Sequence, residues 1–381
     1  MYKKVDTNLD FVQREKEVEK FWKDNDIFQK SIDNRKKGET YTFYDGPPTA
    51  NGKPHIGHVL TRVIKDMIPR YRTMKGYMVP RKAGWDTHGL PVELELEKEL
   101  GLDGKEQIEE YGLEPFIKKC KESVWKYKGM WEDFSSTVGF WADMDNPYIT
   151  YDDNFIESEW WALKQIWDKG LLYKGFKIVP YCPRCGTPLS SHEVAQGYKS
   201  VKERSAIVRF KVKGEDAYFL AWTTTPWTIP ANLGISVNPD FDYSLVDTEK
   251  GKLIMLSSMV DELCDKFEVE KRDVLKTFKG KEFEYITCTH PLYPERESLL
   301  MCGDHVTADA GTGCVHTAPG FGVDDFNIGM KYGLPVYCNV DAQGCMMDDV
   351  GEWLAGQYVE DANKTVTQKL DELGVLLKLQ F

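Results

Sequence analysis

Residues 46–58, GPPTANGKPHIGH, constrain the fold of this chain more than any other stretch. They follow a short apolar run at 41–44, which predicts a strand, and precede residues 59–74, where apolar side chains recur in steps of three and four. That spacing predicts one face of an α-helix, which Gly76 ends. The stretch is therefore a Pro/Gly-rich turn that carries two histidines from a strand onto a helix N-terminus.

The N-terminus of that helix is a place where an anion can bind, because its backbone N–H groups are unpaired and the helix dipole favours negative charge. Gly57 lets a flat ring or a phosphate approach the backbone closely. His55 and His58 can then donate hydrogen bonds to phosphate oxygens. Two alternatives stay open for a His-x-x-His pair, a metal site and two surface histidines with satisfied hydrogen bonds.

A second strand is predicted at 77–79, running on to GWDTHG. Strand, turn, helix and strand make a βαβ unit, which predicts a right-handed crossover in a Rossmann-like parallel sheet. Asp86 follows the second strand, at the sheet edge where such folds bind ligands, and its carboxylate can pair with a substrate ammonium. The alternative is an ordinary surface Asp in a turn.

Further helices are predicted at 10–30, 114–134 and 152–168, where apolar and aromatic residues recur with helical spacing and form scaffold. Cys182 and Cys185 form a C-x-x-C knuckle, whose thiolates have the spacing of half a tetrahedral zinc site. The sequence contains no second C-x-x-C, and His192 is the local candidate for a third ligand. A redox-active cysteine pair is the alternative.

Past residue 200 the pattern changes to short alternating runs, at 205–212, 218–222, 243–246 and 253–256, separated by turn residues, which predict a β-barrel-like domain. Within it Thr223, Thr224 and Thr225 place three hydroxyls beside a proline turn. A Gly-rich turn leads into His316, and Asp325 opens a helix shortly after. The structural alternatives are threonines that only favour a strand and a histidine that is buried in the core.

Composition limits the class of protein. A chain of 381 residues, 41% hydrophobic and 29% charged, is long enough for two or three globular domains. The formal charge of −12 argues against a protein whose main task is to coat nucleic acid. No apolar run is long enough to span a membrane, and nine cysteines in a chain without a signal peptide fit a reducing, cytoplasmic compartment.

The 46–58 stretch resembles the H-I-G-H motif of class I aminoacyl-tRNA synthetases, and together with GWDTHGLPVE at 84–93 it is similar to the isoleucine-specific family of that class. WTTTPWTIPAN at 222–232 and DAGTGCVHTAPGFGVDDF at 309–326 resemble the editing insertion of the same family. The resemblance extends over essentially all 381 residues. A Lys-Met-Ser-Lys-Ser loop, the family's second ATP motif, is absent from the sequence.

The resemblance implies an α/β fold, the first half of a Rossmann-like nucleotide-binding fold with a β-rich, barrel-like editing domain inserted. We expect an N-terminal helical segment at 1–40, the first half of the catalytic domain at 41–195, and the editing domain at 196–381. The chain stops on an apolar strand without a polar tail, so we expect the editing domain to be truncated at its C-terminal end.

The resemblance also implies roles for individual residues. His55, Gly57 and His58 would be catalytic, and the isoleucine site would comprise Gly46, Pro47 and Asp86. The pocket for a mischarged aminoacyl-adenosine end would be formed by the following residues: Thr223, Thr224, Thr225, Thr228 and Asn232. His316 would either limit the side chain admitted or place the water, and Asp325 would hold the α-ammonium group. Cys182 and Cys185 would share zinc with a cysteine pair beyond Phe381.

The implied activity of the complete protein is ATP-dependent activation of isoleucine, its transfer to tRNA(Ile), and hydrolytic editing of valyl-tRNA(Ile). The expected cofactors are ATP with Mg²⁺, and zinc at Cys182 and Cys185. The expected partners are isoleucine, ATP and tRNA(Ile), with no DNA and no membrane, and we expect a cytoplasmic monomer. Two alternatives stay open, a stand-alone aminoacyl-tRNA deacylase and a non-catalytic module that binds amino acid or tRNA.

Overall fold

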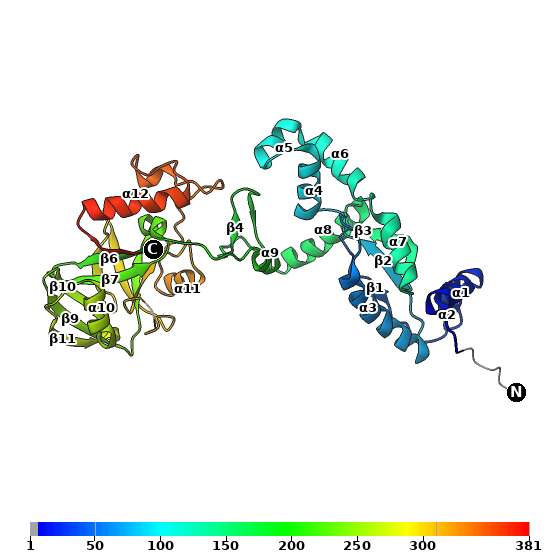
Figure 1. The fold of residues 1–381 in the computed structure, drawn as a ribbon, viewed down its shortest axis with the longest axis horizontal. Helices are drawn as coiled ribbons and strands as arrows, with labels where there is room; N and C mark the ends of the chain where they lie inside the picture. The colour runs from blue at the N-terminus through cyan, green and yellow to red at the C-terminus, as the bar shows by residue number, and fades with distance from the viewer. Residues whose placement is uncertain (1–6, 50, 310, 381) are drawn as a thin grey trace. The chain divides into compact units, whose positions relative to one another are not determined.

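A computed structural model describes residues 7–49, 51–309 and 311–380, so those parts of the predicted stretches that fall on 1–6, 50, 310 and 381 lie outside it. The chain divides into two compact units, Met1–Lys174 and Gly175–Phe381, which we describe separately (Figure 1). Within the described ranges, no helix combines the length and the hydropathy that crossing a bilayer requires.

The first unit contains a small parallel sheet and eight helices among its described residues. Its elements are α1 (Phe11–Asp24), α2 (Ile27–Asp33), β1 (Phe43–Tyr44), α3 (Ile56–Met74), β2 (Arg81–Trp85), α4 (Leu90–Leu100), α5 (Lys105–Tyr111), α6 (Leu113–Ser123), α7 (Lys128–Thr137), β3 (Asp143–Ile149) and α8 (Asp153–Asp168). The strand order is β1-β2-β3, and both pairings are parallel. The predicted β1–α3–β2 unit is therefore confirmed, and the fold of this unit is Rossmann-like α/β.

The second strand was predicted too early, at 77–79, whereas β2 spans Arg81–Trp85. The charged start of β2 hides it from a hydrophobicity pattern. Arg81 is nevertheless buried, because its guanidinium pairs with Asp66 on α3 at 3.2 Å and donates to the Thr73 hydroxyl at 3.1 Å. Desolvation of that buried guanidinium lowers the pKa of Arg81 to about 10.

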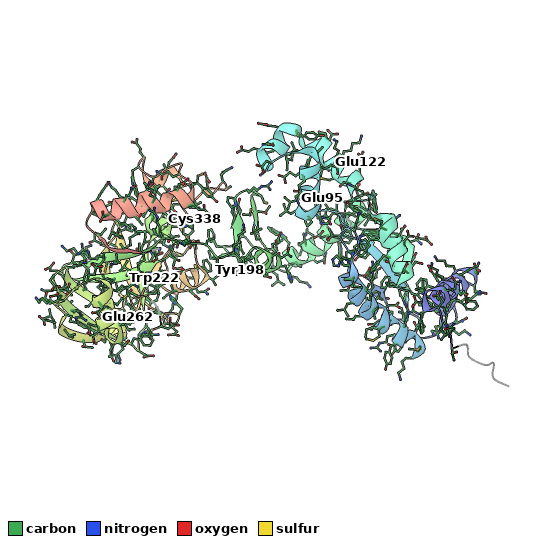
Figure 2. All side chains as sticks on the ribbon, in the orientation of Figure 1. Glu95, Glu122, Tyr198, Trp222, Glu262 and Cys338 are labelled. Atoms are coloured by element: carbon green, nitrogen blue, oxygen red, sulfur yellow. The ribbon has the colours of Figure 1, made fainter. Side chains whose placement is uncertain are left out.

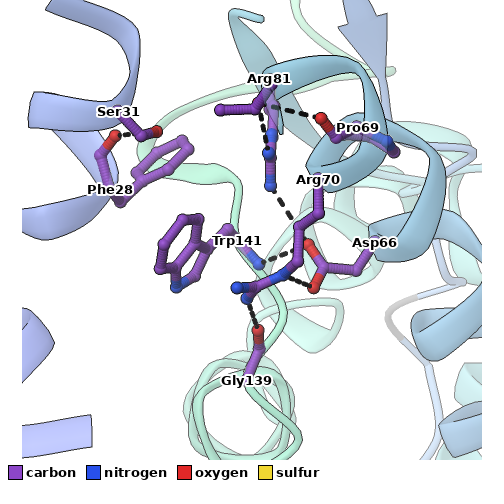
Figure 3. A network of polar contacts seen from close by, with 9 residues as sticks. Phe28, Ser31, Asp66, Pro69, Arg70, Arg81, Gly139 and Trp141 are labelled. Carbon is purple, nitrogen blue, oxygen red and sulfur yellow. Dashed lines mark hydrogen bonds and ion pairs between the residues drawn. The ribbon is translucent and has the colours of Figure 1, made fainter. Parts of the chain in front are cut away.

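Asp66 is the centre of the polar network in Figure 3, which joins α3 to the segment after α7. Its carboxylate pairs with Arg70 one turn further along α3 and accepts the backbone N–H of Trp141 at 3.3 Å. Arg70 also donates to the carbonyl of Gly139 at 2.6 Å, and its guanidinium lies 3.9 Å from the centre of the Trp141 ring. One carboxylate thus fixes the position of two arginines and a loop.

Two predicted helices are each broken into two. The 10–30 helix ends at Asp24, and a new helix starts after Asp26, which has a left-handed φ of 49°. The 114–134 helix is interrupted between α6 and α7, where Val124 is fully buried and the residues after it form tight turns. The apolar spacing continues through both breaks, so periodicity alone cannot reveal them.

The helices α3 and α8 were predicted in the right places, but large apolar side chains on both are exposed in this structure. On α3, Leu60 and Met67 are 65% and 56% exposed. On α8, which was expected to be scaffold, Trp160 and Trp161 are 70% and 67% exposed, and no residue of that helix is buried. The buried apolar cluster of this unit instead forms around Trp85 and Trp131.

The second unit is dominated by β-structure. Its elements are β4 (Tyr181–Cys182), β5 (Thr187–Pro188), α9 (Ser191–Gln196), β6 (Ser205–Val212), β7 (Tyr218–Thr223), η1 (Pro226–Ala231), β8 (Gly234–Val237), β9 (Asp242–Thr248), β10 (Gly251–Leu256), η2 (Ser257–Met259), α10 (Val260–Lys266), β11 (Asp273–Lys279), η3 (Gly280–Phe283), β12 (Thr287–Thr289), β13 (Glu297–Cys302), β14 (Cys314–Thr317), α11 (Val323–Lys331), η4 (Asp348–Val350), α12 (Val359–Glu372) and β15 (Leu376–Gln380). The hairpin β4–β5 and helix α9, which were predicted to belong with the preceding domain, group with this unit.

Six strands close into a barrel in the order β7-β14-β8-β13-β12-β6, because β6 also pairs with β7. Strands β10, β9 and β11 extend the sheet from β7, and β15 pairs with β6. The interior is apolar, with Phe210, Phe219, Ile235 and Leu300 fully buried. Figure 1 shows α12 along one side of this barrel, where Asn363 accepts the backbone N–H of Trp227 at 3.1 Å. The predicted barrel-like domain is confirmed.

Candidate functional site

The turn before α3 holds both predicted histidines at the start of that helix. His55 is the N-cap residue, and its Nδ1 accepts the backbone N–H of Gly57 at 3.1 Å. The Nδ1 atom of His58 accepts the backbone N–H of His55 at 3.0 Å, and the two ring centres lie 3.8 Å apart. Because both Nδ1 atoms accept, each neutral ring carries its proton on Nε2. The helix N-terminus therefore presents two adjacent N–H donors.

His58 is held from behind by Trp131 of α7. The ring centres are 4.7 Å apart, and the indole N–H of Trp131 donates to the carbonyl of Gly52 at 2.8 Å. The pKa of His58 is lowered, first by its partial burial and then by the nearby charges of His55, Arg62 and Lys65. His58 is consequently a neutral hydrogen-bond donor at neutral pH.

A cavity of about 360 Å³ opens in front of these rings. Four of the predicted residues line it, namely Gly46, Pro47, His55 and His58. The other lining residues were not predicted as site residues; they are Pro48, Thr49, Asn51, Gly52, Lys53, Thr61, Arg62, Lys65 and Trp131. Thr61, Arg62 and Lys65 lie on the same face of α3 as His58. Their helical spacing from His58 could have identified them from the sequence as lining residues.

Gly57 is the second residue of α3, and its catalytic role stays a prediction. It is not among the residues that line this cavity, and a Cβ at this position would lie 2.9 Å from Cε1 of His55. The glycine therefore makes room for the His55 ring to fold back over the first turn of the helix. The group that lies close to the backbone at Gly57 is thus the His55 side chain, whereas the sequence predicted a flat ring or a phosphate there.

Asp45, directly after β1, forms ion pairs with two of the residues that line this cavity. Its carboxylate pairs with Arg62 at 2.5 Å and with Lys65 at 3.0 Å, and Lys65 also donates to the carbonyl of Gly46 at 2.6 Å. Both Asp45 and Arg62 are buried. These bonds connect the end of the strand to α3 and fix the start of the turn.

Asp86 lies beside the turn, as predicted from its position after β2. Its backbone N–H donates to the carbonyl of Pro48 at 3.1 Å, and the Thr49 hydroxyl donates to its carboxylate at 3.4 Å. The side chain is half-buried and is not one of the residues lining the 360 Å³ cavity. Asp86 is therefore adjacent to that cavity, across Thr49.

A second cavity, of about 300 Å³, lies in the β-rich unit. Six of the predicted residues line it: Thr223, Thr224, Thr225, Thr228, His316 and Asp325. Trp222 of β7, labelled in Figure 2, also lines it, as do Phe321, His305 and Thr307, which sequence reasoning missed. Asn232 is not a lining residue; it is 1% exposed and lies behind His316.

His316 on β14 forms part of the wall of this second cavity. Its Nε2 lies 2.9 Å from the Thr228 hydroxyl and its Nδ1 lies 2.7 Å from the side-chain nitrogen of Asn232. Burial lowers the pKa of His316 to about 4. The ring is therefore neutral at physiological pH, and it is hydrogen-bonded through both nitrogens.

Asp325 lies in the first turn of α11, next to the same cavity. One carboxylate oxygen accepts the backbone N–H of Ala318 at 3.0 Å, and burial raises the pKa of the side chain. A Cβ at Gly322 would lie 1.9 Å from the other oxygen, so a larger residue there would displace the Asp325 carboxylate. A buried carboxylate with a raised pKa gains free energy when a cation binds beside it.

Cys182 and Cys185 lie in the β4–β5 hairpin, and His192 is an exposed residue of α9. Burial, and then hydrogen bonding to Cys182, raise the pKa of the Cys185 thiol, and a redox-active pair stays the alternative. Among the residues that the structure describes, no three His, Cys, Asp or Glu side chains are grouped as metal ligands. Zinc at this knuckle stays a prediction.

Comparison with known proteins adds independent evidence. The family model described as tRNA synthetases class I (I, L, M and V) matches residues 17–368. The isoleucine--tRNA ligase of Clostridium kluyveri is 55% identical over 380 residues, which are 100% of this chain and 37% of that protein. That of Clostridium tetani is 55% identical over 383 residues, 99% of this chain and 36% of that protein.

Isoleucine--tRNA ligase 2 of Bacillus cereus is 49% identical over 379 residues, covering 98% of this chain and 36% of that protein. The chain thus spans little more than a third of the length of these relatives. The family model nevertheless matches far more than half of the chain. The turn at 46–58 that carries His55 and His58, here called the histidine turn, lies within the matched residues, as do the parallel sheet and the six barrel strands. The chain belongs to the class I tRNA synthetase family.

Proposed function

We propose that the chain is the N-terminal part of an isoleucine--tRNA ligase. In the complete protein, isoleucine would be activated with ATP and transferred to tRNA(Ile), and valine wrongly attached to that tRNA would be removed by hydrolysis. The first unit contributes part of the synthetic site and the second unit contributes the editing site. The proposed location is the cytoplasm, and the proposed state is a monomer.

The histidine turn supports the synthetic part of this proposal. The two Nε2–H donors and the N-terminus of α3 suit the phosphates of ATP, with Lys53 on the same cavity wall. Mg²⁺ keeps several waters and is held largely by substrate phosphates, so it would arrive with the nucleotide and neutralise their charge. Asp86, adjacent to that cavity, has the charge to hold the ammonium group of isoleucine.

A second site is needed because binding energy alone cannot separate isoleucine from valine. The two differ by one methylene, which is worth roughly 1–3 kcal/mol in an apolar pocket, a figure for which this enzyme class is itself the standard example. The single observation that carries the editing proposal is the convergence of Thr223–Thr225, Thr228, His316 and Asp325 on one 300 Å³ cavity. A smaller hydrolytic pocket of this kind can accept valine and exclude isoleucine.

Each group around this cavity suits one part of an aminoacyl-adenosine ester. Asp325 would pair with the α-ammonium group that valine and isoleucine share. The threonine hydroxyls at 223–225 would bond to the ribose and orient the attacking water, and His316 would limit the amino-acid side chain. In the hydrolysis, water attacks the ester carbonyl, the bond to the ribose oxygen breaks, and the proton from water is returned to that oxygen.

The test compares Asp325→Ala with Asp324→Ala, a change in the adjacent, exposed carboxylate that does not line the cavity. Release of labelled valine is measured from valyl-tRNA(Ile) with the full-length protein and from the 2′-valyl ester of adenosine with this chain. Asp325→Ala should lose hydrolysis, since a hydrogen bond to a charged group contributes roughly 1.5–3 kcal/mol, whereas Asp324→Ala should retain it. Normal hydrolysis by Asp325→Ala would refute the ammonium assignment.

Two further measurements separate the alternatives. Isoleucine-dependent ATP–pyrophosphate exchange by the full-length protein distinguishes a synthetase from a stand-alone deacylase. Ester hydrolysis by this chain distinguishes either enzyme from a binding module. A full-length protein that neither exchanges pyrophosphate nor hydrolyses the ester would contradict the proposal as a whole.

A further inference from the structure

Behind the 300 Å³ cavity, which we call the editing cavity, side chains form a chain of hydrogen bonds. One backbone carbonyl determines which group donates in each of these bonds. The side-chain nitrogen of Asn232 lies 2.8 Å from the carbonyl oxygen of Gly234 and 2.7 Å from His316 Nδ1. A carbonyl oxygen only accepts hydrogen bonds, so the NH₂ group of Asn232 has to face it. Its second hydrogen points to His316 Nδ1, which accepts. A neutral imidazole that accepts at Nδ1 carries its proton on Nε2.

The direction continues on both sides of this pair. Nε2–H of His316 donates to the Thr228 hydroxyl at 2.9 Å, and the hydrogen of that hydroxyl goes to the carbonyl of Thr225 at 2.8 Å. At the other end, the Ser298 hydroxyl donates to the side-chain oxygen of Asn232 at 2.5 Å. From Ser298 to the Thr225 carbonyl, each link has one donor and one acceptor, so the directions are mutually consistent.

We propose that Ser298 and Asn232 are positioning residues that hold His316 in its Nε2–H tautomer, so that the ring serves as a fixed wall of the editing pocket and accepts no proton from the attacking water. The inference rests on the proposed editing function and narrows it, because both ring nitrogens of His316 are already bonded to protein groups. Of the two roles expected for His316, limiting the side chain admitted is the one that this geometry supports.

Ser298 acts at a distance from the substrate. It lies on β13, is fully buried, and is not one of the residues that line the cavity. Without its hydroxyl, the side-chain oxygen of Asn232 would be buried without a donor, which favours other orientations of the amide. Asn232 would then no longer offer a steady donor to His316, and the position of the ring in the wall would vary.

Ser236 on β8 provides a matched control. It is also fully buried, and its hydroxyl makes one hydrogen bond, to the Thr317 hydroxyl at 2.8 Å. That bond is not part of the chain that reaches His316. Ser236→Ala and Ser298→Ala therefore remove the same group from equally buried positions, and only the second is expected to affect the pocket.

The experiment measures the tautomer of His316 directly. The 381-residue chain is labelled with [¹⁵N]histidine, and long-range ¹H–¹⁵N correlations are recorded, with His316 assigned by its absence in His316→Gln. The wild type and Ser236→Ala should show a neutral ring protonated at Nε2. Asn232→Asp, which cannot donate, should place a proton on Nδ1, and Ser298→Ala should give a mixture of tautomers. In parallel, hydrolysis of the 2′-valyl and 2′-isoleucyl esters of adenosine is compared, and Ser298→Ala should change their ratio about fivefold or more.

Two results would overturn the proposal. One is a wild-type His316 that is protonated on Nδ1, which the wild type and His316→Gln establish even if Asn232→Asp or Ser298→Ala fails to fold. The other is Ser298→Ala with a single Nε2–H tautomer and an unchanged ratio of the two esters. A wild-type chain that shows the expected tautomer but hydrolyses neither ester would instead count against the editing function, so the two failures are distinguishable.

Discussion

Replacing Asp45 by Asn should destabilise the first unit strongly, because this change removes one partner of a buried ion pair. The Asp45 side chain is fully enclosed, and that of Arg62 is 4% exposed. Lys65 is about a third exposed and can turn towards solvent, but the guanidinium of Arg62 lies 4.3 Å from the centre of the Phe140 ring and cannot. An uncompensated buried charge costs about 3–5 kcal/mol.

The assay is urea unfolding, with hydrogen exchange of the 41–74 region as a local probe. For a slope of about 1–3 kcal/mol per M, the expected loss lowers the midpoint by about 1 M or more, and amides of α3 should exchange faster. Asp24→Asn is the control, because its pair with Lys20 is 2.7 Å long but largely exposed and should contribute about 0–1 kcal/mol. Adding Arg62→Met to Asp45→Asn should recover part of the loss. Equal midpoints for Asp45→Asn and Asp24→Asn would refute the reasoning.

Three further predictions concern the second unit. Burial lowers the pKa of His316 to about 4 and that of His290 to about 3, from an ordinary 6.5. As the pH falls below 6.5, these two histidines therefore bind more protons in the unfolded chain than in the folded chain. The stability that the two neutral histidines contribute above pH 6.5 should be lost as the pH falls towards 4 and 3. A urea midpoint of unfolding that is higher at pH 5 than at pH 7 would contradict this. His316→Ala should widen the editing pocket, so that isoleucyl esters are hydrolysed as well as valyl esters, and an unchanged ratio would place the wall elsewhere. If Cys182 and Cys185 are two of the four ligands of a zinc site, elemental analysis should find zinc held weakly by this chain and tightly by the full-length protein. One tightly bound zinc per 381-residue chain would show that the other ligands are local.

The parts of the fold that could be predicted are those determined by local pattern. The spacing at 59–74 located α3, and alternation located β6, β7, β9 and β10. The parts that were missed depend on contacts between distant residues. Arg81 can begin a buried strand only because Asp66 faces it, and Val124 is buried in the break between two helices, which the continuous apolar spacing does not indicate.

The candidate site follows the same division. The histidine turn and the threonine run were recognisable because their residues are neighbours in sequence. Asn232 looked like a lining residue, but the structure places it behind His316, which is 84 positions away, and Ser298 becomes relevant only through Asn232. His305 lies on the wall of the second cavity with no motif to mark it. Residue type and spacing therefore indicated the chemistry, whereas the supporting side chains needed the three-dimensional structure.

The pairing of β15 with β6 brings two segments together that are far apart in the sequence. Gln380 and Ser205 are opposite each other in that antiparallel ladder, so the start of β6 and the end of β15 lie about 5 Å apart. A gap of that size can be bridged by two or three residues, and a short bridge costs little conformational entropy. A circular permutant in which a short bridge joins the end of β15 to the start of β6 should therefore keep this ladder intact.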